Sequence, residues 1–154
     1  MRLLWTRSKL PAGPLICWGL EEPVSHFAVE FFDTMILQSN FFGVNLVHKK
    51  DFDHFSIEVY AKRLDIDFTG EAALLALILQ NYYGKAYDWK WFFNMVWSAL
   101  KFKITRKKDD SIIWRSRDKF LCTEVVEFLE PVLGKIDVGN GSPFQLALRL
   151  GVIK

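Results

Sequence analysis

Two side chains in this sequence have the types and surroundings that covalent catalysis requires, Cys122 and His26. Cys122 precedes apolar residues at helical spacing, which predicts that it lies in the first turn of a helix. Free backbone N–H groups and the helix dipole favour negative charge there, so we expect a lowered pKa for the thiol. The same N–H groups could hold an oxyanion. On spacing alone, a small buried hydrophobic residue is an equally good interpretation, although preceding basic residues favour a thiolate: Arg115, Arg117 and Lys119.

His26 lies in an apparent strand among small and apolar residues. The chain after it is typical of a hairpin that turns near residues 32–33, which brings Gln38 opposite His26 or one place off. A Gln side-chain oxygen can hold the far imidazole N–H and fix the tautomer. We therefore expect the Cys122 sulfur within about 4 Å of one ring nitrogen and Gln38 against the other. The alternative is a core histidine beside an exposed Gln38.

The elements that must position these side chains are mostly strands early in the chain and helices later. Capping residues and apolar residues at helical spacing predict helices over 71–82, 89–100 and 122–130, and another that Ser142 caps and Pro143 begins. The pattern predicts one α+β domain over residues 1–154, an antiparallel sheet with helices on one side. The predicted strands are 14–20, 24–32, 34–39, 44–48 and 55–61.

Composition excludes several classes of function. Hydrophobic residues make up 51% of the 154 residues, which is typical of a globular chain, and a net charge of +2 gives no reason to expect a nucleic-acid partner. The sequence has two cysteines, no Cys-x-x-Cys and no His pair at helical spacing, so we expect neither a disulfide framework nor a metal or cofactor. The longest apolar run, 72–79, is too short to cross a membrane.

The aromatic segment 89–97 (WKWFFNMVW) is unusual. At helical spacing Trp89, Phe93 and Trp97 line one side, and packing in a core is the first interpretation. Because not all of these rings can face one core, a substrate groove or a docking face for a partner is the second.

Four short segments, in matching order across nearly the whole chain, resemble those of the circularly permuted papain-like hydrolases. This group includes the YiiX-like branch, which is related to the NlpC cell-wall peptidases, and lecithin retinol acyltransferase. The segments are Ser25-His26-Phe27-Ala28-Val29, Gly84-Lys85-Ala86-Tyr87-Asp88, Phe120-Leu121-Cys122-Thr123-Glu124-Val125-Val126 and Ser142-Pro143-Phe144-Gln145-Leu146.

The resemblance implies a permuted papain-like fold with Cys122 as nucleophile at a helix N-terminus and His26 as its general base. The third polar position usually carries a Glu, and Gln38 stands there in this sequence. The implied activity is a cysteine hydrolase of amide or ester bonds that uses a Cys122–His26–Gln38 triad, first of all a cell-wall peptide amidase or endopeptidase. A lipid acyl hydrolase or acyltransferase is an alternative. Gln38 and the aromatic segment favour another, a non-catalytic structural or binding module that retains the fold.

The expected partners are therefore a peptidoglycan peptide or an acyl substrate. The first residues have neither the apolar region nor the cleavage site of a signal peptide. We accordingly expect a cytoplasmic protein, or one carried in a phage virion, as papain-like hydrolases of phage tails are. In a virion, segment 89–97 would be the surface that contacts other tail proteins.

Overall fold

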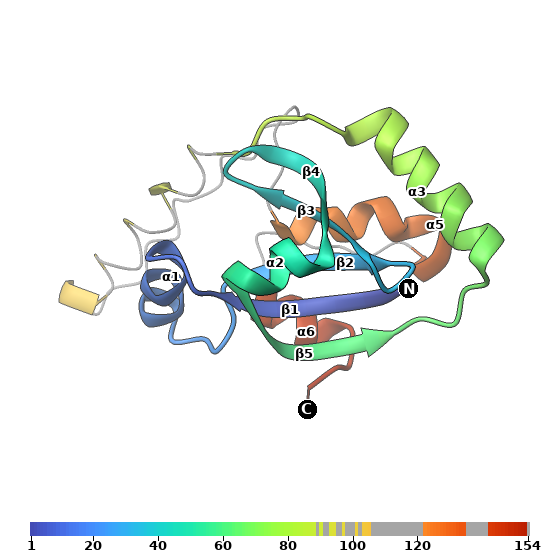
Figure 1. Cartoon of the computed structure of the whole chain (residues 1–154). Coiled ribbons are helices and arrows are strands. Elements are labelled where there is room, and N and C mark those ends of the chain that lie inside the picture. Colours follow the sequence, from blue (N-terminus) through green and yellow to red (C-terminus); the bar gives the residue numbers. More distant parts are fainter. Residues whose placement is uncertain are drawn as a thin grey trace.

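The computed structural model describes residues 1–88, 90, 93, 94, 97, 101, 103–105, 122–134 and 142–153. In this part of the chain the fold is α+β, as predicted, with a five-stranded antiparallel sheet and six helices (Figure 1). The strand order is β4-β3-β2-β1-β5. The strands are β1 (Arg2–Ser8), β2 (His26–Phe31), β3 (Met35–Asn40), β4 (Gly43–His48) and β5 (Ser56–Arg63). The helices are α1 (Ala12–Leu20), α2 (Lys49–Phe55), α3 (Phe68–Tyr82), η1 (Cys122–Leu129), α5 (Glu130–Leu133) and α6 (Pro143–Arg149).

Four of the five predicted strands are present within a few residues of their expected bounds, as β2, β3, β4 and β5. The prediction of a strand over 14–20 is wrong, because this segment belongs to helix α1. A short apolar run does not distinguish a strand from a helix by itself. Helix α1 ends at Leu20, and the residue after it, Glu21, closes the last turn with a positive φ of 58° and an N–H bond to the Cys17 carbonyl.

Strand β1 was not predicted, although it lies between β2 and β5 near the middle of the sheet. Its central residues are fully or almost fully buried, and its charged residues stand near its ends: Leu3, Leu4, Trp5 and Thr6 between Arg2 and Arg7. A strand buried on both faces has a continuous apolar run instead of the polar–apolar alternation that identifies half-exposed strands.

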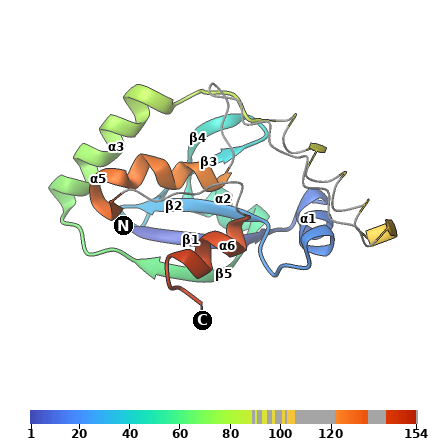
Figure 2. The ribbon, with the colours of Figure 1, turned by 180° about the vertical axis from the view of Figure 1, so that it is seen from behind.

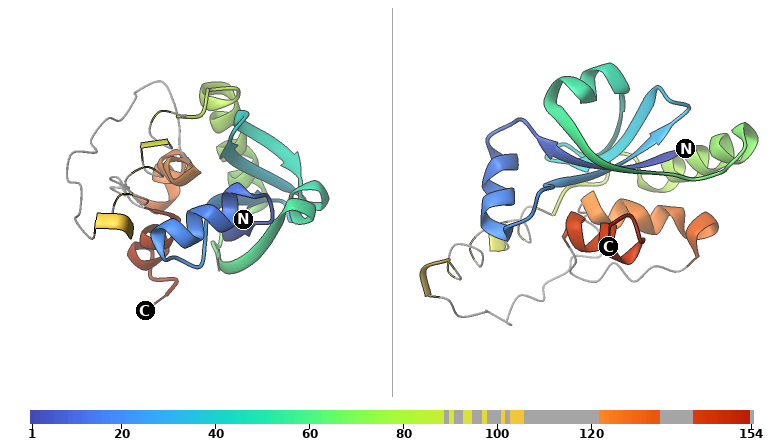
Figure 3. Two further views of the ribbon diagram at one scale, coloured as in Figure 1. Left: turned by 90° about the vertical axis from the view of Figure 1, so that its left-hand side faces the viewer. Right: turned by 90° about the horizontal axis from the view of Figure 1, so that it is seen from below.

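Helices cover both faces of the sheet, so the prediction that they pack on one side is wrong (Figure 3). On one face Phe52 of α2 packs with Leu4, Ala28 and Ile36. On the other face η1 and α6 pack over β2 and β1, where the larger core includes Phe27 and side chains of both helices (Figure 2). Consecutive residues of β2 therefore point into two different layers.

The second helical layer differs in detail from the predicted helix over 122–130. Residues Cys122–Leu129 form a 3-10 helix, and the chain continues through Pro131 as the α-helix α5. Proline, which lacks a backbone N–H, is tolerated there because N–H groups in the first turn of a helix have no intrahelical hydrogen-bond partner. In α6, Ser142 caps the backbone N–H of Gln145 and Pro143 is the first residue, as predicted.

Of the predicted helix over 89–100, the structure describes four residues, and these are helical: Lys90, Phe93, Asn94 and Trp97. Phe93 and Trp97 are 61% and 67% exposed, so the core interpretation is wrong for these two rings. Trp89 lies outside the described residues. Within the described ranges, each helix is too short or too polar to span a bilayer.

Candidate active site

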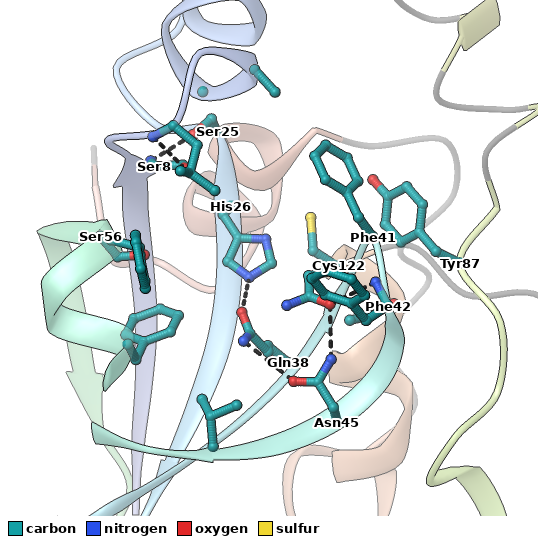
Figure 4. Close-up of a pocket in the computed structure, with 18 of the residues that line it drawn as sticks. Ser8, Ser25, His26, Gln38, Phe41, Phe42, Asn45, Ser56, Tyr87 and Cys122 are labelled. Carbon is teal, nitrogen blue, oxygen red and sulfur yellow. Dashed lines mark hydrogen bonds between the residues drawn. The ribbon is translucent and has the colours of Figure 1, made fainter. Parts of the chain in front are cut away.

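A cavity of about 630 Å³ lies at the end of the sheet where β2 begins, and it contains all three predicted site residues (Figure 4). His26 comes from β2, Gln38 from β3 and Cys122 from η1. Residues 96 positions apart in the sequence therefore line one cavity.

His26 and Gln38 meet through the pairing of β2 with β3. The turn between these strands has three residues, 32–34, and Phe31 pairs with Met35. Ala28 therefore pairs with Gln38, and Gln38 is two places from His26, further than the expected one place at most. Phe32 and Asp33 both have positive φ, which lets this turn close although it is longer than the predicted turn at residues 32–33. The contact still forms because diagonal neighbours on one face of a sheet are within reach of long side chains.

The expected contact between Gln38 and the imidazole is present, with 3.0 Å between His26 Nε2 and Gln38 Oε1. Because the Gln oxygen can only accept, Nε2 carries the proton and Nδ1 keeps a free lone pair. Nδ1 is on the side of the ring nearer to Cys122 (Figure 4). The centroid of the Phe52 ring lies 6.3 Å from that of the imidazole.

Cys122 reaches the cavity from the opposite face of the sheet. Helix η1 packs on the face that Phe27 occupies, whereas His26 shares its face with Ala28 and Gln38. The layer that contains His26 and the layer that contains η1 meet at the start of β2. There the residues before Ala28 are not paired with β3. The backbone N–H of Phe27 donates a hydrogen bond to the Cys122 sulfur, which brings the sulfur to the residue next to His26.

The electrostatics of the pair differ from the expectation of a thiolate. Burial raises the pKa of Cys122 to about 11, against smaller lowering effects of the Phe27 and Thr123 N–H groups. Burial also lowers the pKa of His26 to about 4, and the Gln38 hydrogen bond offsets this only in part. Loss of solvation therefore outweighs the helix N-terminus, and the resting pair is a neutral thiol and a neutral imidazole. The basic residues Arg115, Arg117 and Lys119 lie outside the described residues.

Tyr87 is a site residue that sequence reasoning missed. It lines the cavity and stands edge-on to Phe41, with 5.8 Å between ring centroids. The segment before it is fixed to β4 by two 2.8 Å bonds between the backbones of Val44 and residues 84–85. Burial, followed by the nearby Cys122, raises the pKa of Tyr87 well above 10, so the phenol stays protonated as a donor. The signal that could have found it is its place in the segment Gly84–Asp88 of the resemblance.

Two amides complete the polar side of the cavity, Asn40 and Asn45, and neither was predicted as a site residue. Gln38 Nε2 donates to Asn45 Oδ1 at 3.3 Å, and Asn45 Nδ2 donates to Asn40 Oδ1 at 2.8 Å. Asn45 could have been noticed as a polar residue between apolar residues of a strand, Val44 and Leu46. Among the residues that the structure describes, His, Cys, Asp and Glu form no cluster that could hold a metal ion.

No family model matches the chain, and comparison with curated proteins and with solved structures gives no significant match.

Proposed function

We propose that this protein is a cysteine hydrolase of amide or ester bonds with a permuted papain-like fold, in which Cys122 at the start of η1 is the nucleophile. The observation that carries the proposal is that Cys122 and His26 line one cavity while Gln38 holds the far nitrogen of the imidazole. A nucleophile, a base and a group that orients the base are the three parts that such catalysis needs.

From the neutral resting pair, attack requires general-base assistance. As the sulfur forms a bond to the substrate carbonyl carbon, its proton moves to Nδ1 of His26. Collapse of the tetrahedral intermediate breaks the bond to the leaving alcohol or amine, which takes that proton. Water, deprotonated by Nδ1, then cleaves the thioester and releases the carboxylic acid and the Cys122 thiol. In an acyltransferase another nucleophile would replace water.

The lining of the cavity favours an acyl ester over the polar peptide of a cell wall. Six large apolar side chains contribute to it: Leu10, Ile16, Phe41, Phe42, Phe52 and Phe55. A volume of about 630 Å³ is in the range of sites for small molecules, and such sites gain most of their affinity from apolar contact. We therefore propose that a lipid acyl ester is a better substrate for this site than a cell-wall peptide.

A non-catalytic binding module remains the second candidate, and the protonation of the pair favours it. Proton transfer from a thiol of pKa about 11 to an imidazole of pKa about 4 is unfavourable before any substrate is bound. A module that only binds would use the same apolar cavity without forming a thioester.

The test is acylation of Cys122 by p-nitrophenyl esters of two, four and eight carbons, alongside a cell-wall stem peptide p-nitroanilide. Intact-mass spectrometry after short reaction times locates the acyl group. We expect acylation of Cys122 that is fastest with the longer esters and falls about 10²–10⁴-fold in His26→Ala. Cys17, the other free thiol, provides an internal reference in the same molecule.

The variant Cys122→Ala should lose the acyl adduct, and Cys17→Ala should keep it. If Cys122 reacts no faster than Cys17 and is insensitive to His26→Ala, the hydrolase proposal is wrong and the binding module is the better interpretation. If the stem peptide reacts faster than any of the esters, a cell-wall peptide is the better interpretation of the substrate.

A further inference from the structure

The Gln38 amide belongs to a chain of hydrogen bonds that ends on the backbone of the turn between β3 and β4. Asn45 Oδ1 accepts from Gln38 Nε2 at 3.3 Å. Asn45 Nδ2 donates to the Gly43 carbonyl and to Asn40 Oδ1, both at 2.8 Å. The chain therefore runs from a main-chain carbonyl through two amide side chains to the imidazole of His26 (Figure 4).

The main chain determines the direction of every bond in this chain. A backbone carbonyl only accepts hydrogen bonds, so Asn45 must present its NH₂ group to Gly43 and its oxygen to Gln38. Gln38 must then donate through Nε2 and turn its oxygen toward His26.

Asn40 gives a second main-chain reference for the same direction. The backbone N–H of Phe42 donates to Asn40 Oδ1 at 2.9 Å, and a backbone N–H can only donate. The Asn40 oxygen is thereby fixed in the position where it also accepts from Asn45 Nδ2. The Phe42 N–H, acting through Asn40, and the Gly43 carbonyl therefore impose the same orientation on the Asn45 amide.

We propose that Asn45 is a positioning residue that fixes the tautomer of His26, with the proton on Nε2 and the lone pair on Nδ1. The role of this tautomer in turnover depends on the proposed function, because Nδ1 must be free to take the Cys122 proton. A reversed Gln38 amide would donate to Nε2 and place the imidazole proton on Nδ1, where it blocks that transfer.

The same chain gives a physical reason for glutamine at position 38. The Asn45 oxygen requires a donor there, and an ionised Glu offers only acceptors. The hydrogen-bonding groups around position 38 therefore fit a Gln better than the Glu that the resemblance would place there.

The experiment is NMR of the protein with ¹⁵N-labelled histidine, in which the shifts of the two ring nitrogens report the tautomer directly. The wild-type protein should show His26 with a protonated Nε2 at pH 7. In Asn45→Ala the ratio of the two tautomers should move about fivefold toward protonated Nδ1, the effect of losing one ordinary hydrogen bond. Asn45→Asp should keep the wild-type tautomer, since a carboxylate oxygen still accepts from Gln38. Asn81→Ala, a matched loss of an exposed amide on α3, should not change it.

An unchanged His26 tautomer in folded Asn45→Ala would overturn the proposal, and so would a wild-type His26 that is protonated on Nδ1. The wild-type spectrum tests the inference even if Asn45→Ala does not fold, and Asn45→Val, whose side chain has no acceptor and suits a strand, offers a second loss of the acceptor. Failure of the proposed function gives a different result. The tautomer would then respond to Asn45→Ala as expected, whereas acylation of Cys122 would be absent in every protein.

Discussion

Replacing Gln38 by Glu changes the charge next to the imidazole at a known distance. Two unit charges at the 3.0 Å that separates Gln38 Oε1 from His26 Nε2 interact by about 5 kcal/mol at an effective dielectric constant of 20. Burial of the new carboxylate reduces this gain, and an opposite charge at such distances shifts a pKa by about 1–3 units in practice. We expect Gln38→Glu to raise the pKa of His26 from about 4 to between about 5 and 7.

The consequence for Cys122 can be measured with iodoacetamide. The population of the thiolate–imidazolium pair should grow about tenfold for each pKa unit that His26 gains, and the alkylation rate at pH 7 should follow it. Histidine NMR titration gives the pKa of His26 in the same samples. The matched control is Gln38→Met, which has a similar size and no charge, and it should leave alkylation slow.

The protein should also become less stable in Gln38→Glu, because the Asn45 oxygen would face another acceptor. The expected loss is about 1–3 kcal/mol in the free energy of unfolding. A His26 pKa that stays near 4, with the variant folded, would refute the electrostatic reasoning about this site.

Three further predictions concern stability. Burial lowers the pKa of His26 from about 6.5 in the unfolded chain to about 4 in the folded protein, so the unfolded state binds more protons between these values. Stability should therefore fall by about 3 kcal/mol from pH 8 to pH 4, and urea unfolding should show a weaker fall in His26→Gln. Gly43→Ala should cost at least about 2 kcal/mol, since Gly43 has φ +92° and an added Cβ would lie 2.3 Å from the Lys85 carbonyl oxygen. Gly84→Ala, at φ +78° with open space around it, should cost only about 1 kcal/mol by the same denaturation assay. Leu129→Ala empties a fully buried position in the larger core and should lose about 2–5 kcal/mol, whereas a comparable loss in half-exposed Val132→Ala would contradict the assignment of that core.

The parts of the fold that could be predicted from the sequence are those that local pattern controls. Alternation located β2 to β5, and Ser142 followed by Pro143 located the start of α6. Buried β1 and the short helix α1 were missed because an apolar run without clear period is compatible with either structure. The contact between Gln38 and His26 was predicted, but its register was not, since one extra residue in a turn shifts the pairing of a whole strand.

By itself the sequence determined which residue types were available for chemistry, a thiol, an imidazole and an amide, and the strand and helix tendencies around them. The tertiary structure decided that these side chains line one cavity, and that Tyr87, Asn40 and Asn45 join them. It also reversed the expected ionisation of Cys122, whose pKa burial raises. The physical reason is that solvation and cross-strand distance depend on what packs around a group, and its neighbours in the chain do not specify this.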